Sequence, residues 1–318
     1  MTAPVRLEVP PDVSAPVVVA CSGGADSLAL LALAVDAGLA PVAVHVDHGL
    51  RRGSEREADV VAGAAARLGA GFDARQVHVG AGPNLEARAR SARYDALEAA
   101  RAEHGATAVL VAHTADDQAE TVLLNLLRGS GSAGLGGMPA RRGRVVRPLL
   151  GARRADVRAE CARRELVPVE DPSNEDRAHR RNWIRHEFLP LLERGAGRDL
   201  TPVLARQADV LRAESDFLDA LARAGWPGEA GARARDLAAL PDPLARRAVR
   251  CWLGPPPPAL DEVEAVLAVA RGVRRAVDLA GGRRVQRRGG VMHLVGRGDG
   301  RFADRRRRAG AGDGANED

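Results

Sequence analysis

Seven residues near the start of the chain have the side chains and glycines that an anion-binding loop needs. The segment Cys21-Ser22-Gly23-Gly24-Ala25-Asp26-Ser27 lies between an apolar run, residues 17–20, and a helical pattern, residues 27–39. Adjacent glycines allow a sharp turn and let backbone N–H groups approach a ligand, and the following helix adds its positive N-terminus. The hydroxyls of the two serines are further donors. This pattern is typical of a phosphate-binding loop.

Asp26 is an unusual residue beside phosphate because both groups are negatively charged. A carboxylate is useful there when it holds a cation such as Mg²⁺, which prefers oxygen ligands. The loop lacks the Gly-Lys-Ser/Thr ending of a Walker loop and the third glycine of a dinucleotide-binding loop. A plain glycine turn followed by an N-terminal aspartate is the alternative. The full set of residues, placed after an apolar strand, favours a nucleotide's pyrophosphate with its metal.

Two other polar segments follow predicted strands. Asp47 and His48 come directly after the second apolar run, and the segment His113–Thr121 follows the fourth. Within that segment, Asp116 and Asp117 begin a predicted helix, where ordinary N-terminal capping would account for one of them. Ligands of parallel sheets bind at the C-terminal ends of the strands. We therefore expect the two acids to act beside the phosphate loop as metal or catalytic groups.

Strand-like and helical patterns alternate through the first part of the chain and predict the sheet that positions these loops. The strand-like runs are 17–20, 41–46, 72–79 and 108–112, and the helical runs between and after them are 27–39, 54–68, 84–104 and 115–127. This order predicts an α/β fold with a doubly wound, mostly parallel sheet and helices on both faces. A glycine-dense segment, 129–138, is expected to be neither helix nor strand. It is predicted to be a lid or a linker.

The rest of the chain predicts a basic strand-like run at 141–150, amphipathic helices at 153–165 and 177–192, and then a smaller unit. That unit has helical runs at 201–224, 244–253 and 260–270 and short strands at 276–279, 284–286 and 292–295. We predict a catalytic domain over residues 1–198 and a smaller helical/α+β C-terminal domain over residues 199–296. The tail, residues 297–318, has almost no apolar side chains and is expected to be disordered.

The basic residues of this chain favour an acidic partner. Its 318 residues include no lysine, so all 47 basic residues are arginine, and the net charge is +5. Arginine is always charged and matches phosphate geometry, which makes nucleic acid the expected partner. The predicted helix at 177–192 places Arg181 and Arg185 among polar positions suited to an RNA backbone. A merely solvated, arginine-rich surface is the alternative.

Cysteine usage and hydropathy indicate in which cellular compartment the protein is expected. Cys21, Cys161 and Cys251 lie far apart, which argues against a disulfide scaffold, a zinc site or an iron–sulfur cluster held by cysteine pairs. This usage is typical of a reducing cytosol, so a cytoplasmic protein is expected. We find neither a basic-then-apolar leader nor a run of about 18 apolar residues, so no membrane association is expected.

Taken together, these segments resemble the N-type ATP pyrophosphatases, whose phosphate loop is Ser-Gly-Gly-x-Asp-Ser. Within that superfamily they are most similar to the tRNA(Ile)-lysidine synthetase family. That closer resemblance rests on the Asp-His-Gly-Leu-Arg run at 47–51 and on the segments 84–94, 113–121, 123–131, 134–138, 147–150, 171–174 and 181–185. Where the family's acidic loop begins His-His, this chain has Thr114 in second place. We also expect one small C-terminal domain where longer members carry a further one.

The resemblance implies an ATP-dependent ligase that modifies the wobble cytidine of a tRNA(Ile) with a CAU anticodon. ATP adenylates the C2 oxygen of that cytidine, and the amine of free L-lysine then attacks C2 and expels AMP. ATP and Mg²⁺ are the implied cofactors, with Asp26 as the metal ligand. The implied nucleotide-binding residues are Ser22, Gly23, Gly24, Ala25, Asp26, Ser27, Asp47 and His48.

The same resemblance suggests further roles. Asp117, with Asp116, is the candidate that orients the lysine amine and takes its proton. Arg90 is expected to neutralise charge on the activated cytidine or the phosphates. The expected tRNA contacts are Arg93, Arg181 and Arg185.

Two rival functions are weighed against this one. A tRNA thiolase of the 2-thiocytidine type shares the loop but uses cysteine pairs for a cluster, and the cysteines here are isolated. A non-catalytic nucleotide- or RNA-binding module would not need Asp26, Asp116 and Asp117 together. The sequence does not decide between a monomer and a homodimer.

Overall fold

The computed structural model forms two compact units, Met1–Arg212 and Ala213–Asp318. It describes residues 5–49, 55–80, 82, 85–169, 177, 180–228 and 232–296. The boundary between the two units lies inside helix α9 (Thr201–Gly225), whereas the sequence-based limit at 198/199 falls just before that helix begins. The predicted tail, residues 297–318, lies outside the described residues. Across the described residues, no helix is long and apolar enough to cross a membrane.

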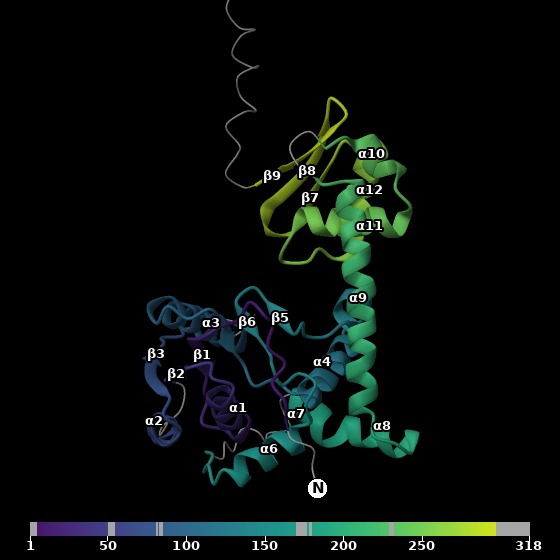
Figure 1. Cartoon of the computed structure of the whole chain (residues 1–318). Helices are drawn as coiled ribbons and strands as arrows, with labels where there is room; N and C mark the ends of the chain where they lie inside the picture. Colours follow the sequence, from purple (N-terminus) through teal and green to yellow (C-terminus); the bar gives the residue numbers. More distant parts are fainter. Residues whose placement is uncertain are drawn as a thin grey trace, which may run out of the picture. The chain divides into compact units, whose positions relative to one another are not determined.

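The first unit is built on a six-stranded sheet (Figure 1). Its strands are β1 (Val17–Ala20), β2 (Pro41–Asp47), β3 (Gly71–Gln76), β4 (Val109–Leu110), β5 (Arg141–Arg142) and β6 (Val145–Val146). The strand order is β3-β2-β1-β4-β6-β5, and every neighbouring pair is parallel except β5 with β6. The predicted doubly wound, mostly parallel sheet is therefore confirmed.

Helices cover both faces of this sheet. One face carries α1 (Ala25–Asp36), α2 (Glu55–Leu68) and α6 (Arg154–Arg163), and the other carries α3 (Leu85–Glu103). Val17 and Val19 pack on the first face, while Val18 belongs to the core beneath α3. Successive strand side chains point to opposite faces, so a central strand with both faces covered needs an unbroken apolar run.

Three local predictions are corrected by the structure. The glycine-dense segment contains a helical turn, α5 (Ser132–Leu135), because side chains of α4 (Ala115–Leu127) hold it: Asn125 Nδ2 donates to Gly134 O (2.7 Å) and Gln118 Nε2 donates to Met138 O (2.9 Å). The run at 141–150 is the hairpin β5–β6 rather than one strand. The described part of the predicted helix 177–192 consists of α7 (Arg180–Trp183), a π-helical turn (Ile184–Phe188) and the start of α8 (Leu189–Ala196).

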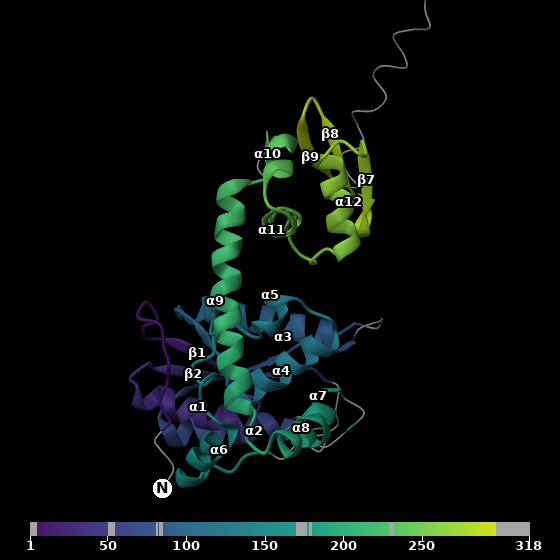
Figure 2. The same cartoon turned by 90° about the vertical axis from the view of Figure 1, so that its right-hand side faces the viewer.

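The second unit packs helices on an antiparallel sheet (Figure 2). Its helices are α10 (Ala234–Ala239), which the sequence did not predict, α11 (Asp242–Leu253) and α12 (Leu260–Ala270). The strands β7 (Ala276–Leu279), β8 (Arg283–Arg288) and β9 (Val291–Val295) pair in chain order, with a 3₁₀ turn (Ala280–Gly282) between β7 and β8. Val266 and Leu267 of α12 pack with Val285 of β8 in the core. A smaller α+β unit was predicted for this part of the chain.

Candidate active site

Three strand-to-helix loops meet at one edge of the first unit's sheet. Because β1 neighbours β4 and β4 neighbours β6, the loops that follow these strands lie side by side. The chain leaves β1 toward β2 and β3 and returns on the other side at β4, and such a switch point is where parallel sheets bind ligands. A cavity of about 1020 Å³ lies here. Residues of all three loops or of the helices that they begin line it: Ser22, Asp26, His113, Asp117 and Arg154.

The phosphate loop is held in its shape by bonds to its own backbone and from outside. The Ser27 hydroxyl donates to the carbonyl oxygen of Gly24 (2.8 Å), which is the N-cap residue of α1. Val169 N donates to Gly23 O (3.0 Å). Gly23 has φ +84°, and a Cβ added there would lie 3.2 Å from Val169 Cγ2. Glycine therefore satisfies both the left-handed backbone and the close approach.

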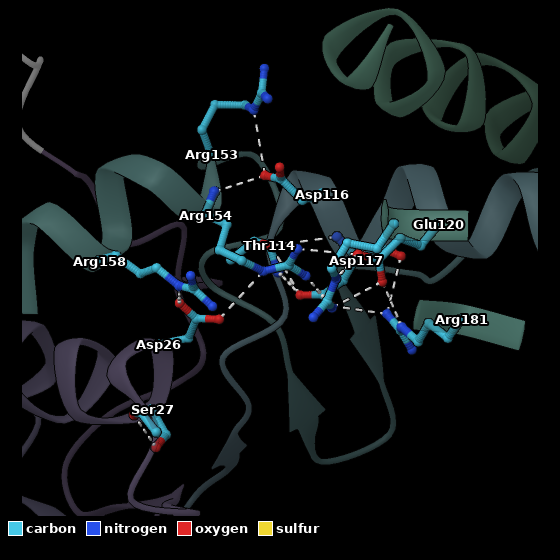
Figure 3. A network of polar contacts seen from close by, with 12 residues as sticks. Asp26, Ser27, Thr114, Asp116, Asp117, Glu120, Arg153, Arg154, Arg158 and Arg181 are labelled. Atoms are coloured by element: carbon cyan, nitrogen blue, oxygen red, sulfur yellow. Dashed lines mark hydrogen bonds and ion pairs between the residues drawn. The ribbon is translucent and has the colours of Figure 1, made fainter. Parts of the chain in front are cut away.

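Asp26 lies in the first turn of α1 with one oxygen left unsatisfied. Its Oδ2 is 3.6 Å from Arg154 Nε and its Oδ1 is 4.0 Å from Arg158 Nε, while the buried Oδ1 has no hydrogen-bond partner in the described part of the chain (Figure 3). Burial raises the pKa of Asp26, and the nearby Arg154 only partly offsets this. Buried oxygens are rarely left unpaired. The site fits an added cation.

The metal-ligand chemistry around Asp26 has a definite limit. Within the described ranges, no three or more His, Cys, Asp or Glu side chains gather into a metal site. Magnesium is commonly held by one or two carboxylates together with substrate phosphates and water. A single carboxylate beside a phosphate loop fits that habit, and it would leave the remaining ligands to the nucleotide.

Helix α4 begins with a capping box formed by Thr114 and Asp117. Thr114 Oγ1 and Thr114 N both donate hydrogen bonds to Asp117 Oδ2, at 2.9 Å and 2.8 Å. In return, Asp117 N donates to Thr114 Oγ1 (3.4 Å). Thr114 is fully buried. The residue that stands in place of the family's second histidine thus caps the helix and fixes one oxygen of Asp117.

The other oxygen of Asp117 belongs to a network of ion pairs (Figure 3). Asp117 Oδ1 accepts from Arg154 Nη2 (2.7 Å) and Arg181 Nη2 (3.0 Å). Burial by itself would raise the pKa of Asp117, but the charges of Arg154 and Arg181, with the Thr114 N–H, lower it to about 2. Asp117 is therefore ionised at any pH near neutrality, and it is a weak base.

Glu120 is the most buried acid of this network, with a side chain only 1% exposed. It accepts from Arg154 Nη1 (3.1 Å), Arg181 Nε (2.7 Å) and Arg185 Nε (2.7 Å). A buried carboxylate survives when it is paired and fully hydrogen-bonded, as here. We call Asp117, Glu120, Arg154, Arg181 and Arg185 the acid–arginine cluster.

Asp116 and Asp117 are adjacent in sequence but do different work. Asp116 Oδ2 accepts from Arg154 N (2.7 Å) and from Arg153 Nε (3.4 Å). Its carboxylate therefore caps the N-terminus of α6, where backbone N–H groups lack helical partners. The catalytic role expected of Asp116 stays a prediction, and its contacts are those of a cap.

The remaining predicted residues divide between the cavity and the neighbouring surface. Arg93 and His48 are among the described residues that line the cavity, whereas Arg90 and Asp47 are not. Arg90 lies 5.2 Å above the ring of Tyr94 and donates to its hydroxyl (3.4 Å). The predicted tRNA contacts Arg181 and Arg185 are engaged inside the acid–arginine cluster, and their role in tRNA binding stays a prediction.

Several residues of the site carry roles that sequence reasoning did not assign. His113 Nδ1 accepts from Arg147 Nε (3.2 Å), so its proton lies on Nε2. Burial lowers the pKa of His113 to about 3, so the ring is neutral.

The place of Glu120 beside Asp117 could have been predicted from its spacing, because residues three apart lie on one helix face and Glu120 follows Asp117 at that distance. Arg154 offered no comparable signal.

Comparison with known proteins shows the family to which this chain is similar. A family model for the PP-loop domain matches residues 6–192. The tRNA(Ile)-lysidine synthase of Thermobifida fusca is 44% identical over 295 residues, covering 87% of this chain and 90% of that protein. That of Streptomyces coelicolor is 43% identical over 296 residues, covering 87% and 84%. That of Nocardia farcinica is 48% identical over 248 residues, covering 76% and 77%.

Among solved structures, the U34-tRNA thiolase NcsA from Methanococcus maripaludis with its [4Fe-4S] cluster superposes with a TM-score of 0.53. The match has 18% sequence identity and covers 64% of this chain and 73% of that one. At this identity the likeness concerns the fold alone.

Proposed function

Because the chain belongs to the tRNA(Ile)-lysidine synthase family of PP-loop proteins, we propose that it joins L-lysine to C2 of the wobble cytidine of a tRNA(Ile) with a CAU anticodon. The reaction consumes ATP and gives lysidine, AMP and pyrophosphate. One observation carries the proposal beyond the family: a single cavity is lined both by the phosphate loop with its unsatisfied carboxylate and by Asp117, Arg154 and Arg185 of the acid–arginine cluster.

The phosphate loop suits the first step. The C2 oxygen of cytidine forms a bond to the α-phosphorus of ATP, the bond from that phosphorus to the bridging oxygen breaks, and pyrophosphate leaves. Backbone N–H groups around Gly23 and Gly24 and the N-terminus of α1 would hold the leaving pyrophosphate. Asp26 would hold Mg²⁺, and the bound ion neutralises phosphate charge. His48 at the cavity wall and Asp47 beside it are proposed to contact the nucleotide.

The acid–arginine cluster suits the second step. The lysine amine forms a bond to C2, the bond from C2 to the adenylated oxygen breaks, AMP leaves, and the nitrogen loses protons. Free lysine carries charges of both signs, and the cluster offers two carboxylates beside three guanidinium groups. A carboxylate whose pKa is about 2 is suited to orienting an ammonium group rather than to removing its proton. We therefore assign Asp117 an orienting role and leave the proton to a stronger base, which includes solvent.

Arg154 connects the two sites. Its Nε lies near Asp26 while its Nη atoms bond Asp117 and Glu120. A ligand that draws Asp26 away from this guanidinium would change the field at the two other acids. Arg90, on the neighbouring surface, is proposed to act on the tRNA or phosphates once they are bound, together with Arg93 at the cavity wall.

The second unit is proposed to bind tRNA. Four of the six residues of β8 are arginine, and a cavity of about 410 Å³ beside it is lined by Arg233, Arg235 and Arg287. Clustered guanidinium groups bind phosphate backbones by charge and by paired hydrogen bonds.

The thiolase alternative is disfavoured by the cysteines. All three are free, and Cys21 and Cys161 are buried. Burial raises the pKa of Cys21 to about 12, so its thiol is neither a nucleophile nor a ready metal ligand. Free thiols are also in keeping with the cytoplasmic location proposed here.

Transfer of labelled lysine to total tRNA with ATP and Mg²⁺, followed by nucleoside analysis, tests the proposed function. We expect label in lysidine only when ATP is present. Reactions without ATP and with methionine tRNA alone are the controls. Absence of lysine from the tRNA, with sulfur incorporated when a sulfur donor is supplied, would replace this proposal with the thiolase.

A further inference from the structure

His45 is a buried imidazole in the wall of the nucleotide cavity that the proposed reaction leaves without a role. It lies in β2, its side chain is 2% exposed, and it lines the same cavity as Ser22 and Asp26. Its Nδ1 lies 3.0 Å from the carbonyl oxygen of Cys21, the residue that precedes the phosphate loop. The ring therefore touches the loop directly.

The hydrogen bond to Cys21 settles where the imidazole keeps its proton. A carbonyl oxygen only accepts, so Nδ1 must be the donor. In the neutral ring, Nε2 then carries a lone pair and acts only as an acceptor. Nε2 is buried and has no hydrogen-bond partner anywhere in the described ranges of the chain.

An acceptor buried without a partner destabilises the folded chain, and such atoms in native structures call for an explanation. The hydrogen bond to Cys21 does not by itself require a histidine, because an asparagine or a serine could also donate to a carbonyl. A ligand that brings a hydrogen-bond donor would remove this destabilisation. The same cavity is also lined by the apolar residues Val44, Val46 and Leu97, which offer a nucleoside the surface that a further phosphate would not need.

We propose that His45 is a specificity-determining residue for ATP, whose Nε2 accepts a hydrogen bond from a donor group on the nucleoside. The donor is the exocyclic amine of adenine or a ribose hydroxyl. The inference rests on the proposed function, because it takes the cavity to be the ATP site. His48, whose Nδ1 is also buried without a partner among the described residues, lines the same cavity.

Two substitutions test the roles of the two ring nitrogens of His45 separately. In His45→Asn the side-chain amide can replace Nδ1 as the donor to Cys21 O, but nothing reaches the position of Nε2. In His45→Gln the terminal oxygen can replace Nε2 as an acceptor, but the donor to Cys21 is lost. Inorganic pyrophosphate is the control ligand because it lacks a nucleoside. Calorimetry of the full chain with ATP·Mg²⁺ and with pyrophosphate·Mg²⁺ gives the affinities, and thermal denaturation monitors the fold.

We expect His45→Asn to bind ATP about tenfold more weakly than wild type and to bind pyrophosphate unchanged. His45→Gln should bind both ligands more weakly, because the loop loses its anchor. An Asn variant that keeps wild-type ATP affinity would overturn the inference, since Nε2 would then have no ligand. If that variant fails to fold, wild-type binding of the analogues described next decides the matter.

Nucleotide analogues identify the donor. Purine riboside triphosphate lacks the exocyclic amine, and 2′-deoxy-ATP and 3′-deoxy-ATP each lack one hydroxyl. The analogue that lacks the recognised group should bind wild type about tenfold more weakly than ATP but should match ATP in His45→Asn. Equal binding of all four nucleotides to wild type overturns the inference and leaves the proposed function intact. A wild-type chain that binds no ATP removes both.

Discussion

Asp26 and Asp117 occupy comparable places yet are in opposite electrostatic states. Each lies in the first turn of a helix that follows one of two neighbouring parallel strands, and each contacts Arg154. Asp117 accepts hydrogen bonds on both oxygens, and its pKa falls to about 2. Asp26 keeps a buried oxygen without a partner in the described structure, and burial raises its pKa.

The phosphate loop therefore has a carboxylate oxygen that still lacks a partner among the described residues, whereas the carboxylates of the acid–arginine cluster are already paired. The phosphate loop supplies donors for an anion and one carboxylate whose remaining partner must come from outside, which is the arrangement a metal-bound nucleotide completes. In the acid–arginine cluster, both carboxylates are already paired with arginines before any ligand binds. A mutation at the first site should therefore harm the chemistry alone, whereas a mutation at the second should also destabilise the fold.

Asp26→Asn should nearly abolish activity. We expect lysine transfer to fall at least about 100-fold, because one charged group that holds the cation is lost. Stability should not fall. Burial raises the pKa of Asp26, so its ionised form costs folding free energy above that pKa, and a neutral side chain removes the cost.

Activity and chemical denaturation at neutral pH test both halves of this prediction. Asp36→Asn is the matched control, because Asp36 lies on the same helix but is 57% exposed and pairs only with Arg164 in the contacts seen here. Full activity of Asp26→Asn would remove the assignment of Asp26 to the metal.

Glu120→Gln should have the largest effect on stability. It removes the charge that three arginines share inside the first unit, and breaking a buried ion pair from one side costs about 3–5 kcal/mol. Urea denaturation of the variant measures the loss. Glu103→Gln is the control, because Glu103 pairs with Arg75 at the surface with 60% of its side chain exposed. A Glu120 variant as stable as the control would show that the cluster is not a structural unit.

Protonation of Asp117 should lower the free energy of unfolding at acid pH. Its pKa is lowered from 3.8 to about 2 in the folded protein, so its contribution is present above pH 4 and is lost as the pH falls toward 2. A shift of this size corresponds to about 2 kcal/mol at neutral pH. The difference in unfolding free energy between wild type and Asp117→Asn should therefore shrink between pH 5 and pH 2.5.

Asp117→Ala is also expected to abolish lysine transfer, because the orienting carboxylate is gone. Labelled-lysine incorporation measured beside the stability difference tests both roles in one variant. A stability difference that stays constant with pH would mean that Asp117 is not the ionised partner of Arg154 and Arg181.

Arg181→Ala should give the smallest effect, a few-fold loss of tRNA affinity with ATP affinity unchanged. The cluster tolerates the loss better than that of Glu120, since Arg154 and Arg185 continue to pair the acids. Filter binding at two salt concentrations measures the tRNA affinity. Arg180→Ala removes the same charge from the adjacent exposed position and is the control. Unchanged tRNA affinity in Arg181→Ala would confine Arg181 to the cluster.

The glycine-dense segment shows where local patterns misled. Gly131, Gly134 and Gly136 disfavour helix by propensity, yet α5 forms there. Asn125 of α4 bonds Gly134 O within α5, and Gln118 of α4 bonds both backbone groups of Met138 just beyond it. Composition reports the intrinsic preference of a segment, whereas these anchors come from a neighbouring helix and outweigh it.

The sequence by itself determined the alternation of strands and helices, the phosphate loop and the presence of acids after β4. Each of these is a local pattern, written in consecutive residues or in a period of two or 3.6. Only the tertiary structure decided that Asp116 turns to cap α6 while Asp117 turns to Arg154 and Arg181. Those partners lie 37 and 64 residues away from Asp117. Strand order brings them together, and no spacing along the chain encodes which of two adjacent carboxylates meets an arginine from another helix.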